Sequence, residues 1–186
     1  MSIKVAINGF GRIGRCTLRA IYEQGLQNEF EVVAINASGD LATNAHLLKY
    51  DTTHGRFATS VETEGEDTII IDGKKIPFYS TKDPKGVNWG SHGVDVLLEC
   101  TGAYTTKAKA QALLDQGARR VLISAPGGDD VDTTIVMGVN EEALKAGMTV
   151  VSNASCTTNC LAPVAKILAD SVGIKQGLMT TIHAYT

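Results

Sequence analysis

A cysteine at the junction between an apolar strand and a helix is the residue of this chain best placed for covalent chemistry. Residues 148–152 predict a strand, and apolar residues at spacings of three and four from Leu161 onward predict a helix. Cys156 therefore lies at the expected helix N-terminus, where free backbone N–H groups and the helix dipole favour the thiolate. Since the thiolate is the attacking form, Cys156 is a candidate nucleophile, although a buried structural cysteine would fit the same pattern.

Hydroxyl groups flank this cysteine, and a histidine follows it in the sequence. Ser155 and Thr157 can donate hydrogen bonds to an anionic group on the molecule that the thiolate attacks. Residues 177–186 predict a strand that carries His183 near its end. If that strand returns to the helix N-terminus, the imidazole can take the thiol proton and later act as a general acid. A lone strand histidine that is merely a polar residue is the alternative.

The N-terminal residues predict a site for the phosphates of a dinucleotide. An apolar strand over residues 3–8 leads into a Gly-x-Gly-x-x-Gly turn, and an amphipathic helix over residues 12–24 follows. Gly9 allows the tight bend, Gly11 lets the backbone approach a pyrophosphate, and Gly14 lets the helix pack on the strand. The alternative is an ordinary glycine-rich turn. The apolar strand that comes next in the sequence makes this alternative the weaker of the two.

A nicotinamide site together with an activated cysteine predicts one type of reaction, the oxidation of an aldehyde with covalent catalysis. The thiolate adds to the aldehyde, the hemithioacetal gives hydride to the cofactor, and a thioester remains for an acceptor to cleave.

Strands and helices alternate between these two regions, which is typical of an α/β, Rossmann-type doubly wound sheet that is mostly parallel. The further strands are expected over residues 30–36, 94–102 and 120–126, and the further helices over residues 43–50, 105–116 and 141–145. Asp72 followed by Gly73 predicts a hairpin that interrupts the parallel order. Thr101 and Gly102 follow a strand, so they should lie at the carboxyl edge of the sheet, where a cofactor binds.

The composition is that of an ordinary soluble globular protein. A net charge of −3, with 44% hydrophobic and 20% charged residues, offers no basic face to a nucleic acid. No apolar stretch approaches the ~20 residues of a membrane span. The first strand leaves no room for a signal peptide, so we expect a cytoplasmic protein. The four cysteines lack metal-ligand spacing, and we expect no metal site.

The cysteines other than Cys156 are expected to be inert thiols. Cys16 falls within the first helix and Cys100 at the end of a strand, where both suit small core positions. Cys160 lies one helical turn after Cys156, a spacing with poor geometry for a disulfide. Pro163 could weaken the helix there, because it removes a backbone N–H.

Five segments resemble the glyceraldehyde-3-phosphate dehydrogenase family, and the resemblance runs through the whole chain. They are VAINGFGRIGR, AHLLKYDTTHG, LLECTG, SNASCTTNC and TTIHAYT. The resemblance implies a phosphorylating dehydrogenase, a homotetramer as a full-length chain, that converts D-glyceraldehyde 3-phosphate, inorganic phosphate and NAD or NADP to 1,3-bisphosphoglycerate and the reduced cofactor. Two alternatives are erythrose-4-phosphate dehydrogenase, which shares most of these segments, and a nucleotide-binding module without turnover.

The resemblance also assigns roles to single residues. Cys156 would be the nucleophile and His183 its activator. Ser155 and Thr157 would line the site for inorganic phosphate and the aldehyde, and Thr186 would reach the substrate's own phosphate. Taken with the motifs above, the expected cofactor-binding residues are Asn8, Gly9, Gly11, Arg12, Ile13, Gly14, Ala37, Ser38, Lys82, Thr101, Gly102 and Ser124.

By the same resemblance, the chain divides into two parts. Residues 1–152 would form the dinucleotide-binding domain, and residues 153–186 would begin an α+β catalytic domain whose remainder is missing from the chain. We therefore expect the 186 residues alone to be inactive.

Ala37 bears on the choice of cofactor, because NAD-preferring relatives carry aspartate at the corresponding position. An acidic residue there accepts from the ribose 2′-hydroxyl and repels a 2′-phosphate. Without it we expect NADP to be tolerated, and Ser38 could donate to the phosphate. No Lys or Arg lies between Glu31 and Lys49 to clamp that phosphate, and Asp40 could swing in as a substitute acid.

Overall fold

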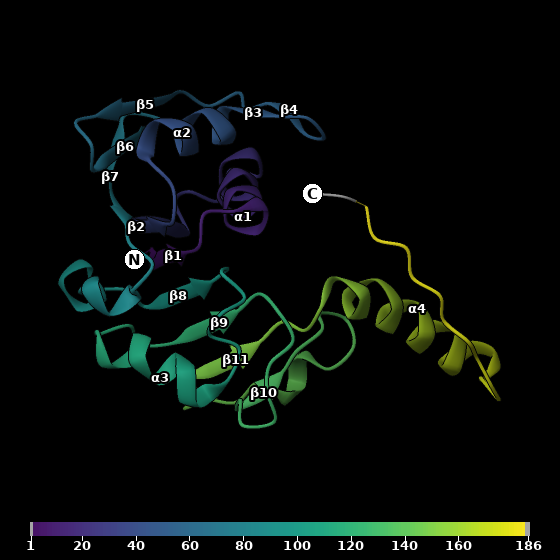
Figure 1. Cartoon of the computed structure of the whole chain (residues 1–186). Coiled ribbons are helices and arrows are strands. Elements are labelled where there is room, and N and C mark those ends of the chain that lie inside the picture. Colours follow the sequence, from purple (N-terminus) through teal and green to yellow (C-terminus); the bar gives the residue numbers. More distant parts are fainter. Residues whose placement is uncertain (1, 185–186) are drawn as a thin grey trace.

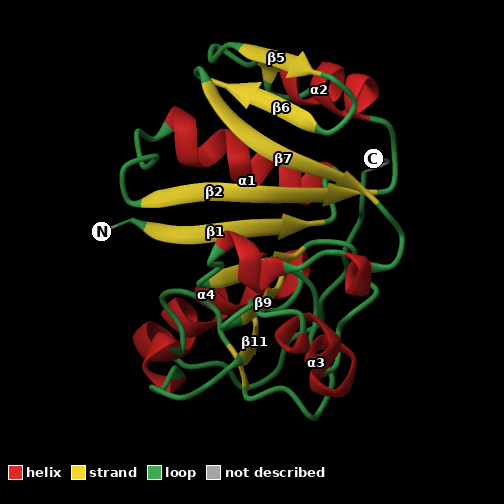
Figure 2. Ribbon diagram, turned by 90° about the vertical axis from the view of Figure 1, so that its left-hand side faces the viewer, coloured by secondary structure: helices red, strands yellow, loops and turns green. Residues whose placement is uncertain are grey.

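The strands form one nine-stranded sheet, most of it parallel, and a separate two-stranded ladder (Figures 1 and 2). The computed structural model describes residues 2–184. The strand order in the large sheet is β10-β11-β9-β8-β1-β2-β7-β6-β5. The strands are β1 (Ile3–Asn8), β2 (Phe30–Ala37), β3 (Tyr50–Asp51), β4 (Gly55–Arg56), β5 (Val61–Glu64), β6 (Thr68–Ile71), β7 (Lys74–Ser80), β8 (Val96–Glu99), β9 (Val121–Ile123), β10 (Thr133–Thr134) and β11 (Val150–Ser152). The helices are α1 (Arg12–Glu23), α2 (Leu41–Lys49), α3 (Lys107–Asp115) and α4 (Cys156–Val172), with 3₁₀ turns η1 (Pro84–Gly86), η2 (Trp89–His92) and η3 (Glu141–Ala143).

The central residues of β1 and β2 are buried on both faces of the sheet, which explains why they are apolar. Ile7 of β1 and Ile35 of β2 belong to the core shared with α1 and α2, whereas Ala6 and Ala34 belong to the core shared with α3. Successive side chains of a strand point to opposite faces, so a strand covered on both sides needs apolar residues at every position. Burying one isoleucine side chain contributes about 2 kcal/mol of stability. The predicted Rossmann-type α/β fold is confirmed.

The predicted hairpin forms where Asp72 is followed by Gly73. Their φ angles are 54° and 74°, in the left-handed region that this two-residue turn requires. β6 pairs antiparallel with both β5 and β7, while β7 also pairs parallel with β2. The antiparallel excursion is therefore joined to the parallel sheet through β7.

Residues 177–184 form no strand, so the strand predicted over residues 177–186 is wrong for the part of it that the structure describes. The side chains of Leu178 and Ile182 are almost fully exposed. A strand is held by hydrogen bonds to a neighbouring strand, and none of the described strands pairs with this segment. α4 is similarly isolated, since it points away from the sheet in Figure 1 and none of its residues is buried.

The predicted helices differ from the observed ones at their boundaries or in their type, and α3, expected over residues 105–116, spans Lys107–Asp115. α2 begins at Leu41 rather than at residue 43, because Asp40 caps it by accepting from the backbone N–H of Thr43 at 2.8 Å. The helix predicted over residues 141–145 is only the three-residue turn η3. Isolated turns of this kind are common connectors, and a short apolar pattern does not distinguish them from a helix.

Candidate functional site

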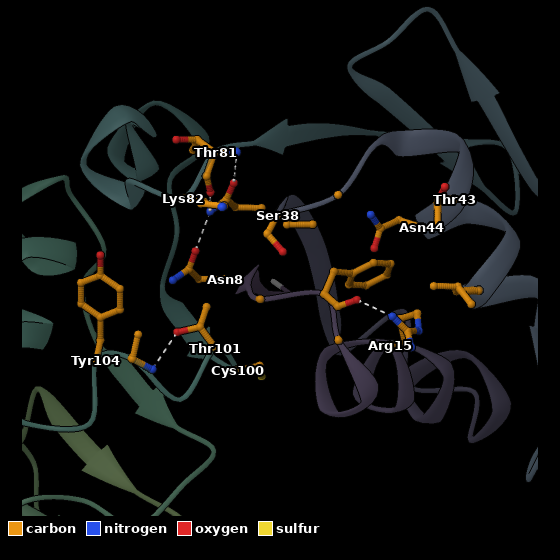
Figure 3. Close-up of a pocket in the computed structure, with 18 residues that line it drawn as sticks. Asn8, Arg15, Ser38, Thr43, Asn44, Thr81, Lys82, Cys100, Thr101 and Tyr104 are labelled. Carbon is orange, nitrogen blue, oxygen red and sulfur yellow. Dashed lines mark hydrogen bonds between the residues drawn. The ribbon is translucent and has the colours of Figure 1, made fainter. Parts of the chain in front are cut away.

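A cavity of about 480 Å³ opens at the carboxyl ends of β1, β2 and β8 (Figure 3). The chain runs from β1 to β2 on one side and later returns to β8 on the other, so the cavity lies where the strand order reverses. Open parallel sheets bind ligands at this place. The predicted cofactor-binding residues that line the cavity are Asn8, Gly9, Gly11, Ala37, Ser38, Lys82 and Thr101.

The N-terminus of α1 adjoins this cavity without a capping side chain. Its N-cap residue is Gly11, no side chain accepts a hydrogen bond there, and the first turn carries no acidic residue. The other α-helices differ, because Asp40, Thr106 and Ser155 accept from backbone N–H groups in their first turns. The α1 amides are thus left for an anion, and the pyrophosphate of a dinucleotide is an anion that suits such a helix end.

The three glycines of the turn are required for different reasons. A Cβ on Gly9 would lie 2.7 Å from the carbonyl carbon of Cys100, and a Cβ on Gly14 would lie 2.2 Å from the carbonyl oxygen of Gly9. Both contacts are prohibitively short, so the packing of β1, α1 and β8 demands glycine at these two positions. A Cβ on Gly11 would meet nothing within 4 Å. The space in front of Gly11 is therefore open to a ligand rather than filled by protein.

Sequence reasoning missed two buried polar side chains beneath the cavity, those of Asn36 and Glu99. Asn36 donates to Asn8 at 2.8 Å, and Asn8 donates to the Glu99 carboxylate at 2.5 Å. Burial raises the pKa of the Glu99 carboxyl, while hydrogen bonds from Thr101 and Asn8 oppose that rise. The signal in the sequence was a polar residue at the end of each of three apolar strands.

Arg12 and Ile13 lie on the first turn of α1 but do not line the cavity. The Arg12 guanidinium forms an ion pair with Asp51. Hydrogen bonds from the backbone N–H groups of His54 and Thr53, together with Arg12, lower the pKa of Asp51 to about 2. Ile13 is 48% exposed.

Gly102 and Ser124 also lie outside the lining of the cavity. Gly102 is exposed, with a φ of 74°. The backbone N–H of Ser124 donates to the carbonyl oxygen of Glu99 at 3.0 Å. Cys100 lines the cavity and contacts the Ser124 side chain. Burial raises the pKa of the Cys100 thiol to about 11, against a hydrogen bond from the Ser124 side chain, so this thiol is neutral at physiological pH.

The residues that line the cavity include two cations, Arg15 and Lys82, and no Asp or Glu. Arg15 donates from Nη1 to the carbonyl oxygen of Phe10 at 2.7 Å, while its buried Nε has no hydrogen-bond partner. Asp40, the substitute acid considered above, is engaged as the N-cap of α2. Arg15 was missed because a cation was sought only in the segment after β2, whereas it reaches the cavity from α1.

Cys156 is the first residue of α4, as the sequence predicted, and it is exposed. Ser155 caps the helix by accepting from the backbone N–H of Thr158 at 2.9 Å. The turn before the cap has an unusual conformation, because Ala154 has a φ of 63°. The hydroxyl of Ser152 holds this turn by accepting from the backbone N–H of Ala154 at 3.0 Å. A strand–turn–helix junction thus presents the thiol at a capped helix N-terminus.

His183 lies beside the residue that follows this cysteine. Its Nε2 is 3.4 Å from the hydroxyl oxygen of Thr157 and 3.2 Å from that of Thr181. The segment after α4 runs back along the helix toward its N-terminus (Figure 1), which explains this proximity. Within the described residues no hydrogen bond joins Cys156 to His183. Thr186 lies outside the described residues.

All four cysteines are free thiols. Cys16 and Cys100 are partly exposed, so the prediction that they are core residues is wrong. The reason is that Cys16 lies beside the Arg12 guanidinium on α1, and Cys100 borders the cavity. Residues 2–184 hold no group of three His, Cys, Asp or Glu side chains suited to a metal ion. Over the same residues, no helix has both the length and the apolar character needed to span a membrane.

Comparisons with known proteins agree with this geometry. The model of the glyceraldehyde 3-phosphate dehydrogenase NAD-binding domain matches residues 3–107, and that of the C-terminal domain matches residues 155–186. Over its whole length the chain is 57% identical to the plasmid-encoded glyceraldehyde-3-phosphate dehydrogenase of Cupriavidus necator and 54% identical to that of Pseudomonas aeruginosa. It is 50% identical to glyceraldehyde-3-phosphate dehydrogenase 2 of Bacillus subtilis. The chain spans about half the length of these relatives, 54% or 55% of each. With more than half of its residues matched by the NAD-binding model, the chain belongs to the glyceraldehyde 3-phosphate dehydrogenase family.

Proposed function

We propose that this chain carries the cofactor pocket and the nucleophile of a phosphorylating dehydrogenase that oxidises D-glyceraldehyde 3-phosphate to 1,3-bisphosphoglycerate with NAD or NADP. The observation that carries the proposal is the position of Cys156, an exposed thiol at the first residue of α4. Its junction follows β11, a strand of the same sheet whose carboxyl edge holds the cavity. Membership of the family supplies the substrate class.

In the proposed reaction the Cys156 thiolate attacks the aldehyde carbon. The new carbon–sulfur bond leaves the electron pair of the carbonyl on its oxygen, and the His183 imidazole, which has held the thiol proton, can protonate that oxygen. The imidazole takes back the proton of the resulting hydroxyl as the sulfur-bound carbon is oxidised, and a bound nicotinamide would supply the hydride acceptor for that carbon. A phosphate oxygen then attacks the thioester carbon, the carbon–sulfur bond breaks, and the thiolate is regenerated.

The two hydroxyls beside the thiol are not equally free to contact inorganic phosphate or the aldehyde oxygen. Ser155 is occupied as the N-cap of α4 and also meets the hydroxyl of Thr158 at 2.7 Å. Thr157 has His183 as its neighbour at 3.4 Å. We therefore assign the contact with inorganic phosphate or the aldehyde oxygen to Thr157 first, with Ser155 holding the helix end that positions the thiol.

Replacing the nucleophile tests the proposal. In the intact protein, Cys156→Ser should abolish phosphate-dependent oxidation of glyceraldehyde 3-phosphate, because a serine hydroxyl is far less acidic than a thiol. Nucleotide affinity should stay within about threefold of the wild type, since α4 does not line the cavity. Cys160→Ser is the matched control, because Cys160 is an exposed thiol on the same helix. Retained activity in Cys156→Ser, or equal loss in both variants, would contradict the assignment.

The substrate is tested by comparing two sugar phosphates. The wild type should use glyceraldehyde 3-phosphate at least about tenfold more efficiently than erythrose 4-phosphate, a difference of about 1.4 kcal/mol in transition-state binding. The reverse order would favour the sister enzyme, erythrose-4-phosphate dehydrogenase. Binding of nucleotide with no oxidation of either substrate would favour a binding module.

We also propose that NADP is accepted and that residues 153–186 begin a second domain. Two features support use of NADP: the lining of the cavity lacks a carboxylate, and it includes the cations Arg15 and Lys82. Two features support the domain boundary. The C-terminal family model begins at residue 155, and no residue of α4 is buried against the sheet.

A further inference from the structure

A hydrogen-bonded row of buried polar side chains crosses the base of the cavity. Asn8, Asn36 and Glu99 lie at the carboxyl ends of three adjacent strands, and the sheet register places Asn8 opposite Asn36 on one side and opposite Glu99 on the other. At most 3% of each residue is exposed. Buried polar groups are tolerated only where they are hydrogen-bonded, so their partners fix how these side chains are oriented.

The row has one direction, which is set at its Thr81 end. The backbone N–H of Thr81 donates to Asn36 Oδ1 at 3.2 Å, and its carbonyl oxygen accepts from Asn36 Nδ2 at 3.1 Å. Asn36 Nδ2 also donates to Asn8 Oδ1 at 2.8 Å, so Asn8 turns its Nδ2 toward Glu99 Oε2, 2.5 Å away. Each amide is oriented by the one before it, and Oε2 of Glu99 can only accept.

The other oxygen of Glu99 is also an acceptor. The backbone N–H of Thr101 donates to Oε1 at 2.7 Å, and the Thr101 hydroxyl donates to the same atom. That hydroxyl in turn accepts from the backbone N–H of Ala103 at 3.0 Å. Both oxygens of Glu99 therefore accept hydrogen bonds, as a carboxylate can. None of the Lys, Arg or His side chains that the structure describes forms an ion pair with it.

The network connects two sides of the cavity. Thr81 lies on one side, Thr101 and Ala103 lie on the other, and Figure 3 shows Asn8 between Thr81 and Thr101. Glu99 itself does not line the cavity. It would therefore act on a ligand only through the residues that it holds in place.

We propose that Glu99 is a positioning residue for the dinucleotide: its carboxylate accepts the last hydrogen bond of the Thr81–Asn36–Asn8 row and holds the conformation of residues 101–103, and thereby the shape of the cavity. The inference concerns binding of the nucleotide and is independent of the thiol chemistry and of the choice between NAD and NADP.

Glu99→Gln keeps the size of the side chain and tests the direction of the network. The new amide must present an N–H group either to the Asn8 Nδ2 donor or to the two donors of Thr101, so one buried donor loses its acceptor. We expect the dissociation constant for the nucleotide to rise about tenfold or more in the folded variant, because a buried donor without an acceptor is costly and disturbs the residues that shape the cavity. NAD and NADP are titrated separately by calorimetry, and thermal unfolding is followed in parallel.

The double variant Asn8→Asp with Glu99→Gln gives Asn36 and Thr101 their acceptors again, while it reverses the hydrogen bond between positions 8 and 99. Its glutamine amide donates to the new aspartate, whose other oxygen accepts from Asn36, and its glutamine oxygen accepts from Thr101. We expect this variant to recover most of the lost affinity, to within about threefold of the wild type. A rescue of this kind distinguishes positioning from a mere need for bulk or charge at position 99.

The outcomes separate the alternatives as follows. Glu62→Gln, which removes a charge from an exposed strand end, is the matched control and should leave affinity unchanged. The proposal is overturned if folded Glu99→Gln binds as the wild type does while only its melting temperature falls. It is equally overturned if the double variant binds no better than Glu99→Gln. If Glu99→Gln does not fold, the double variant decides alone: recovery of folding and affinity supports the proposal, and failure of either overturns it.

Discussion

Ala37 is a small residue at the end of β2 where a single carboxylate would decide the choice of cofactor. It is buried and lines the cavity, and neither it nor its neighbours in that lining bring a negative charge. The nearby acid, Asp40, accepts from Thr43, and this hydrogen bond lowers the pKa of the Asp40 carboxyl. Asp40 therefore stays ionised at neutral pH and occupied at the start of α2.

We predict that Ala37→Asp shifts the ratio of kcat/KM for NADP to that for NAD about tenfold or more toward NAD. The reason is that a carboxylate beside a 2′-phosphate is repelled by about 1 kcal/mol or more even in a watery site, while it can accept from a 2′-hydroxyl. Steady-state kinetics of the intact protein with both nucleotides measure the ratio. Ala42→Asp is the control, since it adds the same charge five residues later, at an exposed position of α2 outside the lining.

The prediction would be contradicted if Ala37→Asp changed turnover with both nucleotides equally. A wild type that used NADP roughly a hundredfold less efficiently than NAD, about 2.7 kcal/mol, would instead remove the basis for expecting any use of NADP.

At this scale the sequence identified the residues that touch the cavity better than those that support it. Gly9, Gly11, Ala37 and Thr101 could be found because a motif or a strand end marks them. Glu99 could not, since its importance depends on which strands lie beside β8 and in which register. A single sequence shows that successive strand residues alternate between faces, but it does not show what the neighbouring strand places opposite them.

At the scale of elements, the junction of β1 and α1 holds one glycine that the packing requires and another that faces the space for a ligand. Gly14 is in contact with the carbonyl oxygen of Gly9, where a Cβ would lie 2.2 Å away, whereas Gly11 faces open space. The two positions belong to the same motif and are three residues apart. Alanine at each should therefore produce different defects.

We predict that Gly14→Ala lowers the free energy of unfolding by about 1–3 kcal/mol, because α1 must move away from β1. Gly11→Ala should cost less, about 0.5–1 kcal/mol, because alanine is a poorer N-cap residue than glycine but its methyl group meets nothing within 4 Å. The Gly11 variant should nevertheless bind nucleotide about tenfold more weakly, since its methyl group enters the space expected for the pyrophosphate. Urea unfolding and calorimetric titration of both variants check the prediction, and each serves as the control for the other. A stability loss confined to Gly11→Ala would refute the assignment.

Elements with a strong local pattern were predictable, and those that depend on distant partners were not. β1, α1, the hairpin at Asp72 and the start of α4 follow from apolar spacing and turn chemistry, which act within a few residues. Residues 177–184 were predicted as part of a strand, yet they form none. Backbone hydrogen bonds between strands supply what the pattern alone lacks, and no described strand supplies them here.

At the scale of the whole molecule, Asp132 joins the edge of the sheet to a helix that covers it. Its carboxylate forms an ion pair with Lys107 at the start of α3 and accepts from the backbone N–H groups of Thr149 and Val150, at 2.7 and 3.0 Å, at the start of β11. The Lys107 side chain, followed by those two N–H groups, holds the pKa of Asp132 well below its usual range. This one carboxylate thus links α3 to the start of β11, next to the strand pairing that joins β10 to β11.

A lowered pKa in the folded state gives this carboxylate a defined effect on stability. Its contribution is fully present above the ordinary aspartate pKa of 3.8 and is lost as the pH falls from there toward the lower folded value. Glu99 acts in the opposite sense, because its raised pKa makes the fold less stable as the pH rises above its ordinary value of 4.5. The acid limb of the stability profile should therefore be governed by Asp132 rather than by Glu99.

We predict that Asp132→Asn lowers the free energy of unfolding by about 2 kcal/mol at pH 7, because the charge-assisted bond to Lys107 is lost. The difference from the wild type should shrink steadily as the pH falls from about 5 to 2, where the wild-type carboxylate also becomes protonated. Urea unfolding of the intact protein across this pH range measures the difference. Asp129→Asn, three positions earlier on the exposed loop, is the control and should leave the pH dependence of the free energy of unfolding unchanged. The prediction is contradicted if Asp132→Asn loses the same free energy of unfolding at every pH. The shape of the Asp132 side chain, rather than its charge, would then account for its role in connecting α3 and β11.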